Sequence, residues 1–182
     1  MDKKYKQEKR NYFKQKYRQK KKLHKNERVK NRLQKKKLYL KYKRAADIIL
    51  SGIAIVVLSP VLLGICIAIK LDSKGAVIFR QTRVGIHKSH FEIYKFRTMY
   101  ADTPKDMPTH LLKNPDAMVT RTGAFLRKYS LDELPQLFNI LRGEMSIVGP
   151  RPALWNQYDL VAERDKYGAN DVMPGLTGWA QI

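Results

Sequence analysis

The sequence has very little of what builds redox or metal centres. Its 182 residues include a single cysteine, Cys66, and four histidines scattered along the chain. One cysteine excludes an internal disulfide and a thiolate metal cluster, and nothing in the composition indicates an oxidising compartment. The sequence also lacks a Walker A motif and a GxGxxG segment, which excludes the commonest phosphate-binding loops. The length leaves room for one modest domain with appendages.

The positive charge of the chain is unevenly distributed. The formal net charge is +21, and residues 1–44 hold 21 lysines and arginines against three acidic residues. The rest of the chain is nearly neutral, with 16 bases and 13 acids. Self-repulsion and scarce apolar side chains predict a polybasic, mobile arm over residues 1–44. We expect anionic lipids rather than nucleic acid to be its partner; single-stranded RNA and a merely solvated tail are the alternatives.

An uncharged apolar run covers residues 48–69. As one straight helix it would extend about 33 Å, enough to cross a hydrocarbon core of about 30 Å. Ser59 and Pro60 lie in its middle, where proline removes a backbone hydrogen bond and bends the helix. Basic residues flank both ends, which predicts that both flanks are cytoplasmic. We therefore expect a re-entrant membrane helix over residues 45–71, broken at Ser59 and Pro60, with a spanning helix and a buried core helix as alternatives.

The remaining residues, 72–182, predict a compact α/β domain that is mostly helical and contains a small β-hairpin. Its strands are expected at residues 76–79 and 91–96, separated by a turn at Gly85. Prolines predict a loop over residues 102–115. Short helical patterns follow at residues 123–129, 131–141 and 152–163. Aromatic residues suited to a membrane interface indicate that several of these amphipathic helices lie along the bilayer: Trp155, Tyr158 and Trp179.

Two adjacent carboxylates, Asp132 and Glu133, are the strongest candidates for chemistry. In one interpretation Glu133 forms a capping box with Ser130 at the start of a helix, which is a structural role. In the other, the helix begins at Pro135 and leaves both carboxylates on its approach, beside apolar side chains. A pair placed in this way could bind a cation or act as a nucleophile and a base.

Arginine residues on both sides of the carboxylates in the sequence are candidates for binding phosphate. Guanidinium groups match phosphate oxygens bidentately, although for each arginine taken singly a surface charge is the more common role. Arg151 lies between Pro150 and Pro152, which restrict its backbone and favour a fixed direction for its side chain. The other candidates are Arg97, Arg127 and Arg142.

Six motifs occur along the chain in a fixed order. They are KRAADIILSGIAIVVLSPVLL, FRQTRVG, FEIYKFRTM, RKYSLDELPQLFNIL, GEMSIVGPRP and PGLTGWAQI. In this order they closely resemble the bacterial sugar transferases called monotopic polyprenyl-phosphate phosphoglycosyl transferases. The resemblance covers about residues 43–182, and the basic arm lies outside it.

The resemblance implies an enzyme on the cytoplasmic face of the bacterial inner membrane. Members of this family transfer a sugar 1-phosphate from a UDP-sugar to polyprenyl (undecaprenyl) phosphate and release UMP, which starts capsule, exopolysaccharide or other envelope glycans. The implied partners are therefore the UDP-sugar donor, the polyprenyl phosphate acceptor and the membrane. The identity of the sugar stays open, as does the oligomeric state, for which a homodimer is one candidate.

The same resemblance implies roles for individual residues. It places the family's nucleophilic aspartate, which carries a covalent phosphosugar intermediate, at Asp132 and its partner glutamate at Glu133. Mg²⁺ is the implied cofactor, with Asp132 as a ligand, because a carboxylate attacking a diphosphate meets like charge. Arg127 matches the arginine that holds phosphate, and Ser59-Pro60 matches the helix break. Three further positions are expected to bind the donor: Arg97, Pro150 and Arg151.

The sequence also departs from the family pattern. Ala76 replaces a usual proline, Lys88-Ser89-His90 replaces a turn that typically contains glycine, and Met173 occupies a position where a basic residue is common. Family members usually continue beyond the position of Ile182, so we expect the catalytic domain, residues 72–182, to be incomplete at its C-terminus. A catalytically impaired, membrane-docked scaffold or regulator is therefore the alternative to an active enzyme.

Overall fold

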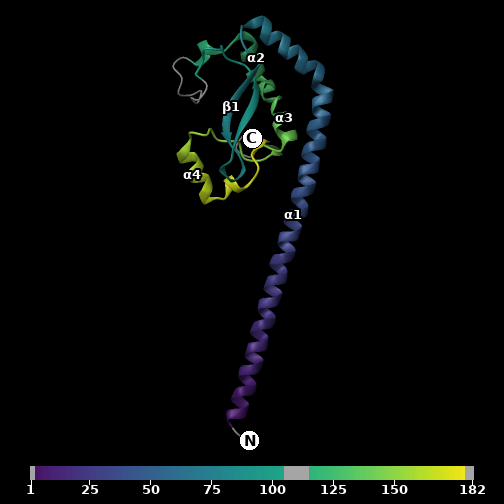
Figure 1. Ribbon diagram of the computed structural model, residues 1–182, viewed down its shortest axis with the longest axis vertical. Coiled ribbons are helices and arrows are strands. Elements are labelled where there is room, and N and C mark those ends of the chain that lie inside the picture. The colour runs from purple at the N-terminus through teal and green to yellow at the C-terminus, as the bar shows by residue number, and fades with distance from the viewer. Residues whose placement is uncertain (1–2, 105–114, 179–182) are drawn as a thin grey trace. The chain divides into compact units, whose positions relative to one another are not determined.

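A computed structural model of the chain describes residues 3–104 and 115–178, and the chain divides into two compact units, residues 1–45 and 46–182. Helix α1 (Lys3–Asp72) makes up the described part of the first unit and continues into the second (Figure 1). The backbone is thus helical where the charge predicts a mobile arm. The reason is that this segment contains neither glycine nor proline, and its abundant lysine, arginine and glutamine favour helix. The mobility of the helix stays a prediction.

The C-terminal part of α1 is long and apolar enough to cross a membrane. The helical backbone continues through Ser59 and Pro60, and Figure 1 shows a bend in this part of α1 instead of an interruption. The hydroxyl of Ser59 donates to the carbonyl oxygen of Val56 at 2.8 Å. Re-entrant insertion stays a prediction. Large apolar side chains are exposed along this segment: Ile48, Ile49, Leu50, Ile53, Val56, Val57, Val61, Leu63, Ile67 and Leu71.

The second unit contains the predicted β-hairpin. Strands β1 (Ile78–Val84) and β2 (His90–Phe96) pair antiparallel, and the turn between them contains Gly85 and a short 3-10 helix, η1 (Ile86–Lys88). The first strand begins two residues later than predicted.

One face of the hairpin is directed toward the candidate site. Residues that lie directly opposite each other on paired strands project on the same side of the sheet. Phe79 is opposite Lys95, and Gln81 is opposite Ile93. This face therefore carries an apolar side chain, Ile93, next to a charged one, Lys95.

Short helices and a second, parallel pair of strands complete the unit. The predicted helix at 123–129 is confirmed, whereas the pattern at 131–141 is divided into two elements and the last helix begins six residues later than expected. The elements are η3 (Pro115–Met118), α2 (Arg121–Lys128), η4 (Leu131–Glu133), α3 (Gln136–Arg142), β3 (Ser146–Val148), α4 (Tyr158–Lys166), η5 (Ala169–Asp171) and β4 (Gly175–Thr177). Strands β3 and β4 are parallel. Trp155 and Tyr158 are exposed, as interfacial residues would be, and Trp179 lies outside the described residues.

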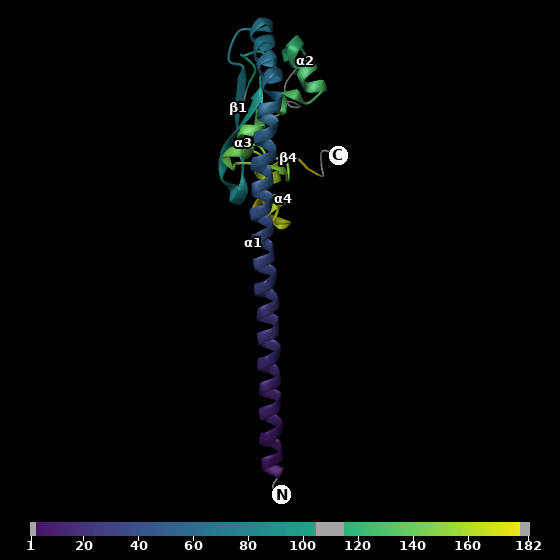
Figure 2. The ribbon, with the colours of Figure 1, turned by 90° about the vertical axis from the view of Figure 1, so that its right-hand side faces the viewer.

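The described core contains two clusters of buried apolar residues, and α1 packs with both. In the first, Ile65 and Ile69 of α1 pack with Phe96 and Leu126. The second joins the hairpin to α3, with Ala54 and Ile55 of α1 packed against it. Within this unit α3 thus lies between α1 and the hairpin, as Figures 1 and 2 show. The buried members of the second cluster are Ile93, Leu137, Ile140 and Met145.

Polar contacts also attach α1 to the rest of the second unit. The buried carboxylate of Asp47 accepts hydrogen bonds from the Ser146 hydroxyl at 2.7 Å and from the backbone N–H of Ile147 at 3.1 Å. At the other end of the segment, the guanidinium of Arg97 donates to the carbonyl oxygens of Ser73 and Lys74, just beyond the helix. The apolar part of α1 is therefore an integral element of this unit.

Candidate active site

The two carboxylates lie on a short 3-10 turn and not inside a regular helix. Helix α3 begins after Pro135, and residues 131–133 form η4. Ser130, in the left-handed region with φ 54°, makes no side-chain capping bond, so the capping-box interpretation is wrong. The alternative, in which both carboxylates lie on the approach to a helix that begins at Pro135, agrees with the structure. The side chains of Asp132 and Glu133 are only 13% and 18% exposed.

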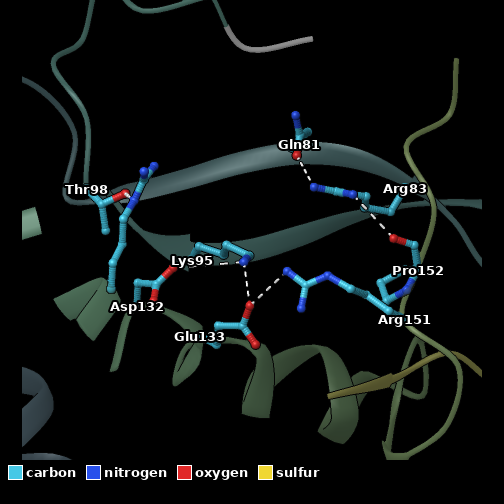
Figure 3. A network of polar contacts seen from close by, with 9 residues as sticks. Gln81, Arg83, Lys95, Thr98, Asp132, Glu133, Arg151 and Pro152 are labelled. Atoms are coloured by element: carbon cyan, nitrogen blue, oxygen red, sulfur yellow. Dashed lines mark hydrogen bonds and ion pairs between the residues drawn. The ribbon is translucent and has the colours of Figure 1, made fainter. Parts of the chain in front are cut away.

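Lys95 connects the two carboxylates. Its ammonium group lies 2.7 Å from Oε1 of Glu133 and 3.9 Å from Oδ2 of Asp132 (Figure 3). The first distance is a hydrogen-bonded ion pair, whereas the second is an ion pair without a hydrogen bond. Arg151 approaches the same Glu133 oxygen at 3.2 Å from the loop after β3. Glu133 is thus held between two cations, and Asp132 is held less tightly.

This difference gives the two carboxyl groups opposite pKa shifts. Burial raises the pKa of Asp132 above its usual value, and the attraction of Lys95 only partly offsets that effect. Burial also acts to raise the pKa of Glu133, but the ion pairs with Lys95 and Arg151 outweigh it and lower the pKa. Glu133 therefore stays ionised at neutral pH, while Asp132 carries a destabilised and more basic carboxylate.

Further basic groups surround the pair. The Nε of Arg127, on α2, donates to the Thr98 hydroxyl at 2.9 Å, and Thr98 follows the end of β2, the strand that carries Lys95. Arg83 donates to the side-chain oxygen of Gln81 and to the carbonyl oxygen of Pro152. Burial, with repulsion from Arg151, lowers the pKa of Arg83 to about 10. The local field is therefore strongly positive.

A cavity of about 640 Å³ opens beside these groups. Asp132 is the one acidic residue on its described wall, which also carries the bases Arg80, Arg83, Lys95, Arg97, Arg127 and Arg151. Glu133 instead borders an adjoining space of about 10 Å³, whose lining shares Arg83, Lys95 and Arg151 with the cavity. Of the two adjacent carboxylates, Asp132 is thus the one that lines the large cavity. A cavity of this size and sign suits a dianionic ligand such as a nucleoside diphosphate sugar.

Sequence comparison connects this geometry to known proteins. The family model of the bacterial sugar transferases matches residues 38–182. The chain belongs to the bacterial sugar transferase family. The resemblance inferred from the six motifs is therefore confirmed.

Curated relatives of this sugar transferase act on undecaprenyl phosphate, according to their names. The chain is 44% identical over 145 residues to an undecaprenyl-phosphate glucose phosphotransferase of Komagataeibacter xylinus, covering 77% of this chain and 27% of the relative. It is 45% identical over 148 residues to a UDP-glucose:undecaprenyl-phosphate glucose-1-phosphate transferase of Escherichia coli K12, covering 77% and 30%. An Aeromonas hydrophila relative, 41% identical over 148 residues and covering 80% and 34%, is a UDP-N-acetylgalactosamine-undecaprenyl-phosphate N-acetylgalactosaminephosphotransferase. The sugar transferase chain therefore spans about a third or less of the length of these relatives.

The structure brings together most of the predicted site residues. Asp132, Arg127 and Arg151 line the cavity, with Glu133 directly behind. Arg97 also lines it, but its guanidinium is bonded to carbonyl oxygens at the end of α1, and its Nε is buried without a hydrogen-bond partner. That geometry indicates a structural role for Arg97. Pro150 precedes Arg151 in the loop after β3 and does not line the cavity, and the Arg142 guanidinium contacts Tyr94.

Sequence reasoning missed three functional candidates: Lys95, Arg83 and Thr98. Lys95 is two positions from the buried Ile93 in a strand, so alternation places it on the covered side of the hairpin. A charge at an inward position of a strand could have revealed it. No comparable signal distinguishes Thr98, whose role depends on α2 packing against it.

The carboxylates fit the Mg²⁺ that this family's chemistry implies. Within residues 3–104 and 115–178 no group of three or more His, Cys, Asp or Glu residues could hold a metal alone. Mg²⁺ is commonly bound by one or two carboxylates, with substrate phosphates and water completing its shell. Asp132, which faces the cavity and lacks a close hydrogen bond to Lys95, can supply such a ligand.

Proposed function

We propose that this sugar transferase moves a sugar 1-phosphate from a UDP-sugar to undecaprenyl phosphate and releases UMP. A carboxylate oxygen of Asp132 attacks the phosphorus that carries the sugar, and the bond from this phosphorus to the UMP oxygen breaks. The phosphosugar is then attached to Asp132 as an acyl phosphate. A phosphate oxygen of the polyprenyl carrier attacks the same phosphorus and frees the carboxylate.

The position of Asp132 is the observation that carries this proposal. Its carboxylate is the one acidic group on the described cavity wall, which also carries six basic side chains, so a diphosphate donor and an anionic nucleophile can approach each other. Arg127, oriented by Thr98, and Arg151, held by Glu133, are placed to bind phosphate oxygens. When bound, Mg²⁺ would neutralise charge on the diphosphate and on departing UMP, with Asp132 as its protein ligand.

Glu133 has a positioning role in this proposal and does not contact the donor. Its lowered pKa keeps it ionised, so it is a poor proton donor at neutral pH. Its ion pairs hold Lys95 and Arg151 at the edge of the cavity. We therefore assign Glu133 the positioning of the two cations.

The exposed apolar surface of α1 supports a location at a membrane. The acceptor's polyprenyl tail would stay in lipid while the UDP-sugar stays in water, so the reaction needs an enzyme at the boundary. We place the enzyme on the cytoplasmic face of the bacterial inner membrane, where it would initiate a capsule, exopolysaccharide or another envelope glycan. Tags at residues 1 and 182 that fall on opposite sides of the membrane would contradict the re-entrant topology.

UMP release tests the proposed activity. The full chain, in nanodiscs with undecaprenyl phosphate and Mg²⁺, is incubated with a panel of UDP-sugars, beginning with UDP-glucose and UDP-N-acetylgalactosamine because relatives use them by name. We expect UMP with at least one donor and none from Asp132→Asn. Asp159→Asn, an exposed change on α4, should retain full activity.

Intact-mass analysis tests the covalent step. Protein incubated with donor and Mg²⁺ but no acceptor should gain the mass of one phosphosugar, and Asp132→Asn should not. Folded protein that releases no UMP with any donor would support the alternative, a membrane-docked scaffold. Turnover without any adduct would contradict the nucleophilic role of Asp132.

A further inference from the structure

The ammonium group of Lys95 is a cation at the place where a divalent ion is needed. Its side chain is 16% exposed, so it is not a freely moving surface lysine. It extends from β2 between the two carboxylates, as Figure 3 shows, and its hydrogen bond goes to Glu133. Asp132, the group proposed to bind Mg²⁺, has Lys95 as its ion-pair partner among the described residues.

The charges around Asp132 disfavour a second cation when no donor is present. Lys95 and Arg151 pair with the carboxylates, and Arg83 and Arg127 lie on the same cavity wall. With Arg80 and Arg97 also on this wall, six positive groups surround the two carboxylates. A divalent ion bound by Asp132 alone would be repelled by these groups, and by Lys95 first, because Lys95 pairs with the same carboxylate.

A diphosphate donor reverses this balance. Its phosphate oxygens bring negative charge into the cavity and offer the Lys95 ammonium new hydrogen-bond acceptors. They also supply the ligands that the protein does not provide within the described residues. The repulsion between Lys95 and the metal is then compensated at the moment when the metal is required.

We propose that Lys95 is an internal counter-ion that makes divalent-metal binding at Asp132 depend on the donor's diphosphate. This inference rests on the proposed function for the identity of the donor, but not for the contacts of Lys95. Because linkage is reciprocal, the metal also strengthens donor binding by the same factor. The free enzyme therefore keeps its nucleophile paired with lysine, and the metal and the donor enter together.

Metal binding in the absence of donor tests this role directly. Mn²⁺, which is visible by electron paramagnetic resonance, is titrated into the full chain in nanodiscs of neutral phosphatidylcholine, which avoids adsorption to anionic lipid. The charge-removing variant Lys95→Met should bind Mn²⁺ at least tenfold more tightly than the wild type. Lys95→Arg, which keeps the charge, should bind like the wild type.

Two further variants separate the local effect from a general one. Lys88→Met removes one positive charge at an exposed site, where Lys88 pairs with Asp165, and should leave Mn²⁺ affinity unchanged. In the double variant Lys95→Met/Asp132→Asn the gain should disappear, because the ligand is lost. Lys95→Gln, which can still donate to Glu133, repeats the test if Lys95→Met fails to fold.

The outcomes distinguish this inference from the proposed activity. A folded Lys95 variant without charge that binds Mn²⁺ within threefold of the wild type overturns the counter-ion role, whatever UMP release shows. An equal gain in Lys88→Met, or a gain that survives the loss of Asp132, overturns it as well. If the gain appears but no UDP-sugar yields UMP, the counter-ion role stands and the proposed activity fails.

Discussion

Replacing Asp47 should destabilise the whole catalytic unit, although this residue is far along the chain from the active site. Asp47→Ala removes a buried carboxylate that accepts two hydrogen bonds, one from the Ser146 hydroxyl and one from the backbone N–H of Ile147. Both donors then lose their acceptor. Hydrogen bonds to a charged group contribute about 1.5–3 kcal/mol each, and part of this is offset by no longer burying a charge. We expect a loss of about 3 kcal/mol, which corresponds to about 10 °C in Tm for a unit of this size.

The assay is thermal unfolding of detergent-solubilised protein, followed by tryptophan fluorescence and circular dichroism. Asp159→Ala, on the exposed side of α4, is the matched control and should change the Tm by less than about 2 °C. Ser146→Ala should be less damaging, and its effect should be largely absent in the Asp47→Ala background because the two share one hydrogen bond. Equal melting temperatures for Asp47→Ala and Asp159→Ala would refute the reasoning.

Three more predictions concern the site. Asp132→Asn should have a higher Tm than the wild type at neutral pH, because the raised pKa of Asp132 means that its ionised form disfavours the folded state; a lower Tm would contradict this, and the difference in Tm should disappear as the pH falls below the ordinary aspartate pKa of 3.8. The kcat/KM for UMP release should fall on the acid side with a pKa above the ordinary 3.8 of an aspartate, since the nucleophile of the free enzyme must be ionised, and a kcat/KM unchanged down to pH 3.8 would contradict the raised pKa of Asp132. Gly123→Ala should cost about 1–3 kcal/mol and lower UMP release, because its new Cβ would lie 2.0 Å from the carbonyl oxygen of Thr98; a variant with the wild-type Tm and rate would show that α2 can move away.

Much of the fold follows from local sequence patterns. The hairpin was predictable because alternating strands flank a glycine turn, and the helix at Arg121–Lys128 because its apolar positions recur at helical spacing. The helix over the apolar run at residues 48–69 was also predictable, because this run is uncharged and long. The helical backbone of the basic arm does not follow from its charge pattern, which favours a mobile segment; it follows from the strong helix preference of lysine, arginine and glutamine.

The active site was only partly predictable, for a different reason. Motif order predicted Asp132, Glu133, Arg127 and Arg151 as site residues, because they lie within contiguous motif segments, and the structure brings these residues close together. Which partners they contact depends on packing between distant elements: Lys95 reaches Glu133 across 38 residues of sequence. The structural role of Arg97 could likewise not be predicted, since its acceptors, Ser73 and Lys74, lie just beyond α1 and are 24 and 23 residues away in the sequence.

The way α1 is built into its neighbours limits how this protein can be handled. Ile65 and Ile69 fill the interior beside Phe96, while Asp47 and Arg97 fasten the two ends of the same stretch. Cutting the chain after Asp72 to obtain a lipid-free fragment would therefore remove Ile65 and Ile69 from the core and leave a cavity beside Phe96. It would also leave the hydrogen-bond donors of Ser146 and Ile147 without their acceptor, Asp47. The apolar part of α1 and the candidate active site belong to a single folding unit, so crystallisation trials and inhibitor screens will need both parts together, with detergent or lipid to cover the exposed apolar side chains.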